Sequence, residues 1–233
     1  MAAFHATGDR AGARDPKDRY ETPDDVVEAL MRRFGHFFEG HESFDPCCGT
    51  GRVVRCLRRL GYDAVGTDLE EDEQDFLSED YQPDGRTDLP MACVTNPPYS
   101  LAREFVEKAI ATYDGPVAML LPQDFLGSAG RRDWLHGPGR PMWILNVPWR
   151  IKFYRRDGTE IAGQAYSHQW VLWPAAGYRP ARDTRYDWAS LTPERAARVA
   201  CGSGQYNRAG KQMWGRLNER RSAGDAPAGQ DGG

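Results

Sequence analysis

The chain has 233 residues, of which 40% are hydrophobic and 27% are charged, and its formal net charge is −4. A chain of this length can bury one sizeable core, which predicts one domain. No stretch reaches the roughly 20 apolar residues of a membrane helix, and residues 1–19 lack the apolar core of a signal peptide. These features predict a cytoplasmic protein without a membrane partner.

The charged residues are unevenly distributed along the chain. Residues 68–80 contain eight acids and no base, which is typical of a solvated loop. Residues 178–221 contain ten Lys or Arg against four acids and form a candidate phosphate-binding surface. The small negative net charge therefore does not exclude a nucleic-acid partner.

The cysteines do not predict a metal site. They are Cys47, Cys48, Cys56, Cys93 and Cys201, an odd number without the paired spacing of a zinc site. We expect reduced, buried and inert thiols, and no metal.

The first predicted helix follows a typical start signal. Thr22 is the expected N-cap, Pro23 the first helical residue, and acids follow in the first turn. The apolar face that ends before Gly35 consists of Val26, Val27, Leu30, Met31 and Phe34.

The remaining elements alternate in type. Strands are predicted at residues 43–46, 63–67, Met91–Thr95, 116–121, 143–147 and, as the last strand, 169–173. The helix after Gly51 has an inner face of Val53, Val54, Leu57 and Leu60. The helix over 100–113 buries Leu101, Phe105, Val106 and Ala109, and a short helix covers 128–136.

Strands that alternate with helices predict an α/β fold, in which a mostly parallel sheet is covered by helices on both faces. We expect a disordered N-terminal arm at 1–18 and the sheet domain at 19–177. Residues 178–233 are expected to form a basic C-terminal extension that ends in a disordered tail.

A glycine-containing loop follows the first strand. Its residues are Asp45-Pro46-Cys47-Cys48-Gly49-Thr50-Gly51, at the carboxyl end where α/β sheets bind ligands. Asp68 follows at the end of the next strand and suits the two hydroxyls of a ribose. Because the G-x-G-x-x-G and Gly-Lys-Ser/Thr patterns are both absent, a nucleoside cofactor without pyrophosphate is predicted.

A second loop, Asn96-Pro97-Pro98-Tyr99, follows the strand Met91–Thr95. The side-chain carbonyl of Asn96 and the neighbouring backbone carbonyl can both accept hydrogen bonds from one NH2 group, which localises the nitrogen lone pair. The two prolines stiffen the loop and lack competing N–H groups. Tyr99 offers a flat face to a planar substrate, so the loop predicts group transfer to a planar amine.

These segments resemble those of the class I S-adenosylmethionine-dependent methyltransferases. The glycine loop looks like their D-P-x-C-G-T-G cofactor motif, and the second loop looks like the N-P-P-Y motif of the amino-methylating members. Tyr20-Glu21-Thr22-Pro23 resembles the Y-x-T-P segment of DNA adenine methyltransferases. The resemblance covers about residues 20–173. It implies a Rossmann-like class I methyltransferase domain of the small phage or bacterial adenine-N6 type, in a bacterial or phage-infected cell.

The resemblance also implies the roles of the cofactor site. Asp45 would hold the methionine amino group of S-adenosyl-L-methionine, Asp68 the ribose and Asp75 the adenine amine, while Phe76 packs on the adenine. Cys47 narrows the pocket. The other residues implied to line it are Tyr20, Thr22, Pro23, Gly49, Gly51 and Asn96.

The implied partner is DNA with an adenine flipped out of the helix. Catalysis falls to Asn96, Pro97, Pro98 and Tyr99, without a metal or a general base. The implied substrate-contacting residues are Tyr99, Gln123, Arg150 and Phe153. Trp170 and Trp173 are expected in the core, and His168 is expected to be structural.

Other substrates stay open at this point. An RNA base methyltransferase fits the same loops, a cytosine-N4 enzyme usually has Ser at position 96, and a protein glutamine methyltransferase usually carries an N-terminal bundle. A non-catalytic methyltransferase subunit is a fourth alternative. Only about 60 residues follow Trp173, which predicts a short or loose recognition sequence.

Overall fold

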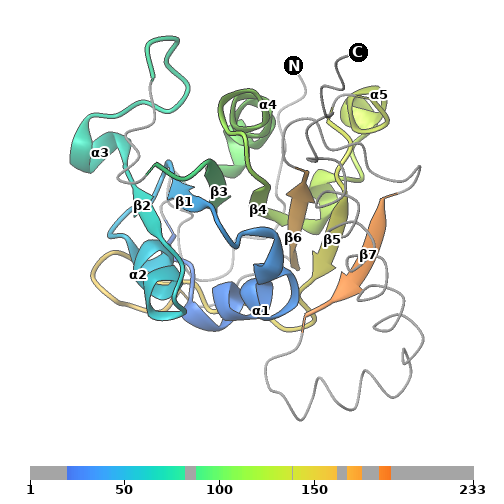
Figure 1. The fold of residues 1–233 in the computed structure, drawn as a ribbon. Coiled ribbons are helices and arrows are strands. Elements are labelled where there is room, and N and C mark those ends of the chain that lie inside the picture. Colours follow the sequence, from blue (N-terminus) through green and yellow to red (C-terminus); the bar gives the residue numbers. More distant parts are fainter. Residues whose placement is uncertain (1–19, 82–87, 138, 162–166, 175–183, 190–233) are drawn as a thin grey trace, which may run out of the picture. The chain divides into compact units, whose positions relative to one another are not determined.

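The fold is an α/β sheet with helices on both faces (Figure 1). The computed structural model describes residues 20–81, 88–137, 139–161, 167–174 and 184–189. The strands are β1 (Glu42–Asp45), β2 (Ala64–Gly66), β3 (Met91–Thr95), β4 (Val117–Pro122), β5 (Trp143–Asn146), β6 (His168–Trp173) and β7 (Arg185–Trp188). The α-helices are α1 (Asp24–Phe34), α2 (Arg52–Arg59), α3 (Leu69–Asp72), α4 (Ala102–Thr112) and α5 (Arg132–Leu135). Short 3-10 helices cover Gly35–Phe37, Tyr99–Leu101, Gln123–Phe125 and Ala129–Arg131.

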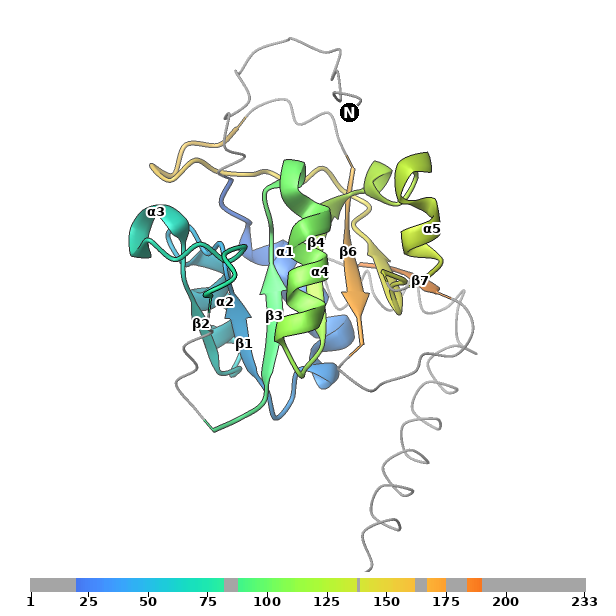
Figure 2. The ribbon, with the colours of Figure 1, turned by 90° about the horizontal axis from the view of Figure 1, so that it is seen from above.

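The seven strands form one sheet in the order β2-β1-β3-β4-β6-β5-β7. Strands β2, β1, β3 and β4 are parallel to one another, and β7 is parallel to β5. Strand β6 runs antiparallel to both of its neighbours, β4 and β5, so its arrow points opposite to that of β3 in Figure 2. The sheet is therefore mixed and mostly parallel.

Each strand of the sheet centre faces two helical layers. On β4, Ala118 and Leu120 belong to one hydrophobic cluster, whereas Val117, Met119 and Leu121 belong to another. The first cluster includes the apolar faces of α1 and α2, and the second includes those of α4 and α5. Successive residues of a strand point to opposite faces of the sheet, so β4 contributes to both clusters. Figure 1 shows α1 and α2 below the sheet and α4 and α5 above it.

Helix α1 is held by charge as well as by its apolar face. Asp24 and Asp25 lie in its first turn and Arg32 and Arg33 in its last, which suits the helix dipole. The carboxylate of Asp24 also accepts hydrogen bonds from Arg52 Nε and Arg59 Nη1 of α2, at 2.9 and 2.7 Å. These contacts join two helices of one layer.

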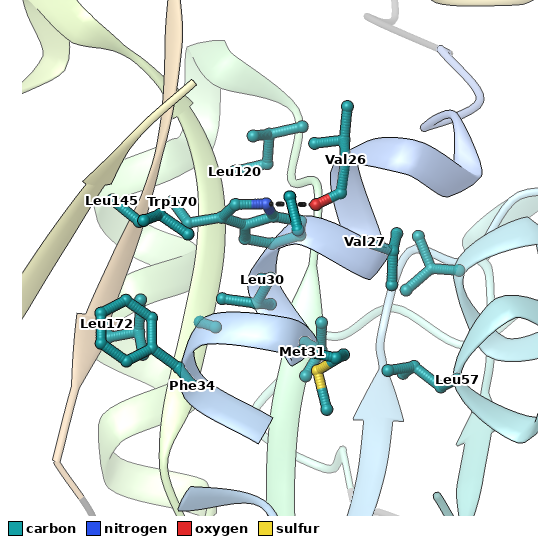
Figure 3. Packing of buried hydrophobic residues seen from close by; sticks show 14 of the residues in the cluster. Val26, Val27, Leu30, Met31, Phe34, Leu57, Leu120, Leu145, Trp170 and Leu172 are labelled. Atoms are coloured by element: carbon teal, nitrogen blue, oxygen red, sulfur yellow. Dashed lines mark hydrogen bonds between the residues drawn. The ribbon is translucent and has the colours of Figure 1, made fainter. Parts of the chain in front are cut away.

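The centre of the α1 layer is Trp170 of β6 (Figure 3). Its side chain is 0% exposed, and its indole Nε1 donates to the backbone oxygen of Val26 at 3.0 Å. Leu120, Leu145 and Leu30 belong to the same cluster. The sequence therefore placed Trp170 correctly in the core, and Trp173 is buried in the other cluster, on the opposite face of the sheet.

Most predicted elements are confirmed, with four corrections. Helix α1 begins after Pro23, which is itself the N-cap and is extended, so Thr22 does not cap the helix. Leu60 and Leu101 were expected inward but are 40% and 42% exposed, because α2 ends at Arg59 and Leu101 precedes α4. The last strand of the described sheet is β7, which lies beyond residue 177, where we expected the sheet domain to end.

Several sequence predictions lie outside the described residues. These are the N-terminal arm, Cys201 and the part of the basic extension from residue 190 onward. All described residues belong to one compact unit, Met1–Ala189. Within them, every helix is too short or too polar to cross a membrane.

Replacing Trp170 with Phe should lower the free energy of unfolding by about 1–3 kcal/mol, because the change removes the hydrogen bond to Val26 and leaves a cavity. Urea denaturation measures this effect. The matched change Trp188→Phe should cost under about 0.5 kcal/mol, since Trp188 is 57% exposed. Equal effects of the two changes would contradict the packing described.

Candidate active site

The candidate site lies where the direction of the sheet connections reverses. Strand β1 sits between β2 and β3, so the chain leaves β1 toward one side and later returns to its other side. Parallel sheets bind ligands at the carboxyl ends of strands at such a point. A cavity of about 380 Å³ lies there. Its walls include Tyr20, Glu21, Thr22, Asp45, Cys47, Cys48, Gly49, Asp68, Glu70, Asp75, Phe76, Asn96, Pro98 and Arg156.

A buried carboxylate joins the ends of β1 and β3. Asp45 is 2% exposed, and its Oδ1 accepts a hydrogen bond from Thr95 Oγ1 at 2.7 Å and from the backbone N–H of Cys47 at 3.3 Å. The sulfur of Cys47 lies 2.9 Å from Thr95 Oγ1. Since the Thr95 hydroxyl donates to Asp45, the thiol of Cys47 donates to Thr95. This chain of contacts holds the glycine loop against the loop that begins at Asn96.

Burial raises the pKa of Asp45 to about 7, and the nearby carboxylates of Asp68 and Glu21 add to the rise. The hydrogen bonds from Thr95 and Cys47 act in the opposite direction. Asp45 therefore changes its charge near neutral pH at the floor of the cavity.

The glycine loop requires its glycines. Gly49 and Gly51 have φ values of +54° and +82°, in the left-handed region that side chains disfavour. A Cβ at Gly49 would also lie 2.7 Å from Glu21 Oε1. Glu21 accepts hydrogen bonds from the backbone N–H and the hydroxyl of Thr50, at 3.0 and 2.9 Å. An acid therefore occupies two donors of the glycine loop just before Gly51, the N-cap of α2.

Asp68, at the end of β2, is fixed by three donors. Its Oδ2 accepts from the Gly49 N–H at 3.0 Å, and its Oδ1 accepts from the Glu70 N–H at 3.0 Å. Oδ1 also pairs with Arg156 Nη2 at 3.1 Å. Asp68 thus links the glycine loop to a segment far along the chain.

Asn96 is oriented by the segment that precedes α1. Its Nδ2 donates to the backbone oxygen of Tyr20 at 3.4 Å. Its Oδ1 is buried and has no hydrogen-bond partner among the residues that the structure describes. Asn96 also lines the cavity, so this unpaired acceptor belongs to a residue beside the space that a ligand would fill.

Phe76 and Asp75 form a further wall of the cavity. Phe76 is 2% exposed, and its ring lies 5.1 Å from the rings of both Phe105 and Tyr81. The carboxylate of Asp75 is exposed and accepts a hydrogen bond from the Leu77 N–H at 2.9 Å. Phe76 is therefore a buried wall of the cavity, whereas the carboxylate of Asp75 faces solvent.

The predicted substrate residues do not line this cavity. The ring of Tyr99 lies 5.6 Å from that of His168, and Phe153 lies 5.0 Å from His168 on an edge-to-face approach. Phe153 is 0% exposed, so it would reach a substrate only after a rearrangement. Gln123 and Arg150 are exposed, and Gln123 donates to Asn146 Oδ1 at 3.3 Å.

The structure brings most of the predicted cofactor residues together. The members that line the cavity are Tyr20, Thr22, Asp45, Cys47, Gly49, Asp68, Asp75, Phe76 and Asn96. Pro23, Gly51 and Pro97 lie outside its lining. Sequence reasoning missed Thr95, Glu21 and Arg156. The position of Thr95 at the end of an apolar strand was a usable signal, whereas nothing in the sequence pairs Arg156 with Asp68.

The four described cysteines, Cys47, Cys48, Cys56 and Cys93, are free thiols. Burial raises the pKa of Cys48 to about 12 and that of Cys47 well above its usual range. Among the described residues, no three His, Cys, Asp or Glu side chains are placed to share a metal ion.

Two solved structures resemble this fold at low sequence identity. One is a methyltransferase subunit of a type I restriction-modification system from Streptococcus thermophilus, with a TM-score of 0.55 and 17% identity over 79% of this chain. The chain spans about half of that protein, 54% of its length. The other, from Listeria monocytogenes, is assigned to the class I S-adenosylmethionine-dependent methyltransferases. It has a TM-score of 0.50 and 14% identity over 78% of this chain and 70% of that one.

These likenesses confirm the predicted fold class. The chain has the class I methyltransferase fold, with a seven-stranded, mostly parallel sheet. No protein-family model and no curated protein sequence matches the chain.

The Asp45 carboxyl should make stability depend on pH. Its pKa is about 7 in the folded protein against an ordinary value of 3.8, so the folded state binds more protons between these values. The free energy of unfolding should therefore fall as pH rises from about 4 to about 7. Urea denaturation across this range should show that Asp45→Asn lacks this component.

The control is Asp75→Asn, which changes an exposed carboxylate and should keep the pH dependence of the unchanged protein. Parallel curves for Asp45→Asn and the unchanged protein would contradict the account of Asp45.

Proposed function

We propose that this protein transfers the methyl group of S-adenosyl-L-methionine to the N6 amine of adenine in DNA. The observation that carries the proposal is the buried Asn96 Oδ1, an acceptor without a partner in the described part of the chain. Leaving such a group buried costs about 1–3 kcal/mol. A planar amine that donates to this oxygen would remove that cost.

The charge of the cavity supports a cationic cofactor. Its lining includes the acids Glu21, Asp45, Asp68, Glu70 and Asp75, whereas Arg156 is the one base among the described lining residues. S-adenosyl-L-methionine carries a sulfonium and an ammonium group against one carboxylate, so its net charge is positive. Opposite charges within a partly buried site attract strongly, which favours this cofactor over an anionic nucleotide.

The position of Glu21 argues against a pyrophosphate cofactor. Its carboxylate takes the backbone N–H and the hydroxyl of Thr50, two donors of the glycine loop just before Gly51, the N-cap of α2, and its negative charge there repels a phosphate. A nucleoside joined to an amino acid needs no anion site there. The observed contacts therefore support the predicted absence of a phosphate group.

We assign the residues as follows. Asp45, at the floor of the cavity, holds the amino group of the cofactor, and Asp68 binds the ribose hydroxyls. Asp75 binds the adenine amine, and Phe76 packs on the adenine ring. The supporting facts are that these four residues line one cavity and that Asp45 and Asp68 lie at adjacent strand ends.

In the proposed reaction, the cofactor supplies a methyl group on a sulfonium sulfur, which keeps the bonding electron pair when the methyl leaves. Asn96 Oδ1 and the neighbouring backbone carbonyl accept the two N–H groups of the target amine. These bonds hold the nitrogen lone pair toward the methyl, so catalysis is mainly positioning and electrostatics. The methylated nitrogen then loses a proton to solvent.

Several features support DNA adenine as the acceptor. The Tyr20–Asn96 hydrogen bond gives the Y-x-T-P segment a direct link to the catalytic loop. Flipping a base costs a few kcal/mol, and stacking on an aromatic ring returns about 1–3 kcal/mol. Tyr99 is half-buried and is backed by His168, which keeps its ring in place for such stacking. One protein of similar fold is a restriction-modification methyltransferase subunit.

The change Asn96→Ala should lower turnover on the order of 100-fold or more, because the acceptor acts on the amine in the transition state. Cofactor affinity should stay within a few-fold, since the other cavity walls are unchanged. Methyl transfer to DNA and calorimetric cofactor binding measure the two effects separately. A large loss of cofactor binding would refute this division of roles.

A deletion tests the part of the basic extension from residue 190 onward. Ser190–Gly233 contains seven Lys or Arg against four acids, and we propose that it contacts the phosphate backbone. Ending the chain after Ala189 keeps β7, which pairs with β5. The shortened protein should bind duplex DNA more weakly and with a flatter dependence on salt, because each lost phosphate contact lowers the slope by about 0.9. An unchanged slope in DNA-binding titrations would contradict the assignment.

A further inference from the structure

The segment that follows β5 folds over the candidate site. In Figure 2 the gold part of the chain runs along the carboxyl-end edge of the sheet toward α3. Tyr154 and Glu21 exchange backbone hydrogen bonds, from Glu21 N to Tyr154 O at 2.8 Å and from Tyr154 N to Glu21 O at 3.3 Å. The segment then turns at Gly158, where φ is +84°, and returns through Glu160, which bridges Tyr154. We call residues 153–161 the flap.

Arg156 ties the tip of the flap to the end of β2. Its Nη2 lies 3.1 Å from Asp68 Oδ1, and its Nη1 lies 3.6 Å from Glu70 Oε2. The Arg156 side chain is 29% exposed and that of Asp68 12% exposed. Arg156 also lines the cavity, so the ion pair is part of the cofactor site and not of the outer surface.

The hydrogen bonds of Asp68 limit what else it can bind. A carboxylate has about four lone-pair sites, two on each oxygen. Oδ1 already accepts from the Glu70 N–H and from Arg156, whereas among the described residues Oδ2 accepts from the Gly49 N–H alone. Two ribose hydroxyls that approach one on each oxygen find room on Oδ2 only. Arg156 must therefore leave Oδ1 before the ribose can bind through both hydroxyls.

We propose that Arg156 is a displaceable latch, which holds the flap to Asp68 in the free protein and is replaced there by the ribose of the adenosyl cofactor. This inference rests on the proposed function. Cofactor binding then releases the flap tip from β2, because the ligand differs in affinity between the latched and released states.

The released flap is connected to the catalytic loop. Its Tyr154 is paired with Glu21, and the preceding residue, Tyr20, accepts the hydrogen bond that orients Asn96. A movement of the flap at Arg156 can therefore be transmitted to Asn96 through the backbone of Glu21 and Tyr20. Binding of the ribose at Asp68 would therefore change the orientation of the Asn96 side chain.

The test measures binding of S-adenosylmethionine and of its 2′,3′-dideoxy analogue, which lacks both ribose hydroxyls, by calorimetry. A partly exposed ion pair is worth up to about 1 kcal/mol, so Arg156→Ala should bind S-adenosylmethionine about fivefold more tightly. Binding of the dideoxy analogue should change less than about twofold, because it does not compete for Asp68. The matched control is Arg155→Ala, since Arg155 is exposed on the same flap, and both of its affinities should be unchanged.

Equal tightening for both ligands would mean that Arg156 acts only by charge repulsion, and weaker binding would make it a ligand-holding residue. Either outcome overturns the latch while leaving the proposed function intact. If the unchanged protein binds no adenosyl ligand, the proposed function fails and the latch fails with it.

Hydrogen exchange gives an independent readout. Amide exchange in the flap should rise when S-adenosylmethionine binds the unchanged protein, and it should already be high in ligand-free Arg156→Ala. Unchanged flap exchange in both comparisons would also overturn the latch.

Discussion

The hydrogen bond between Thr95 and the buried carboxylate of Asp45 is the constraint on which the site depends, because it joins the ends of β1 and β3. With Cys47 attached to the same hydroxyl, it sets the glycine loop against the loop of Asn96. The two halves of the site are distant in sequence, yet both emerge at the point where the sheet connections reverse. A ligand bound by the glycine loop therefore lies beside the loop that begins at Asn96.

The arrangement of strand ends around the cavity also accounts for its negative charge. Strand ends contribute Asp45 and Asp68, and the segment before α1 contributes Glu21. Such closely placed acids repel one another, which is one reason for the raised pKa of Asp45. A cationic ligand relieves this repulsion, while Arg156 relieves part of it in the free protein. Arg156 of the flap and the proposed cationic cofactor would thus both reduce the repulsion among the acids of the cavity.

Sequence patterns predicted the parts that depend on local periodicity and on strand ends. Met91–Thr95 is a strand with the predicted bounds, and Asp45, Asp68 and Asn96 meet because parallel strands end at one edge. Strand β7 was missed because it has only four residues, although Tyr186 and Trp188 alternate with charged residues as in a strand. The Arg156–Asp68 pair joins residues 88 positions apart through an irregular segment, for which no periodicity exists. Phe153 was assigned to the substrate from the family resemblance, and its side chain is 0% exposed in the structure.

The most direct test of the central claim, that one cavity brings a sulfonium methyl group to an amine held by Asn96, is a transfer assay with methyl-tritiated S-adenosylmethionine. Duplex DNA, single-stranded DNA, RNA and a protein extract are offered in parallel, and the labelled product is digested to its components. Label is expected in N6-methyladenine from DNA. Label only in RNA or protein would contradict the proposed substrate, and the absence of transfer to any acceptor would contradict the account of the site.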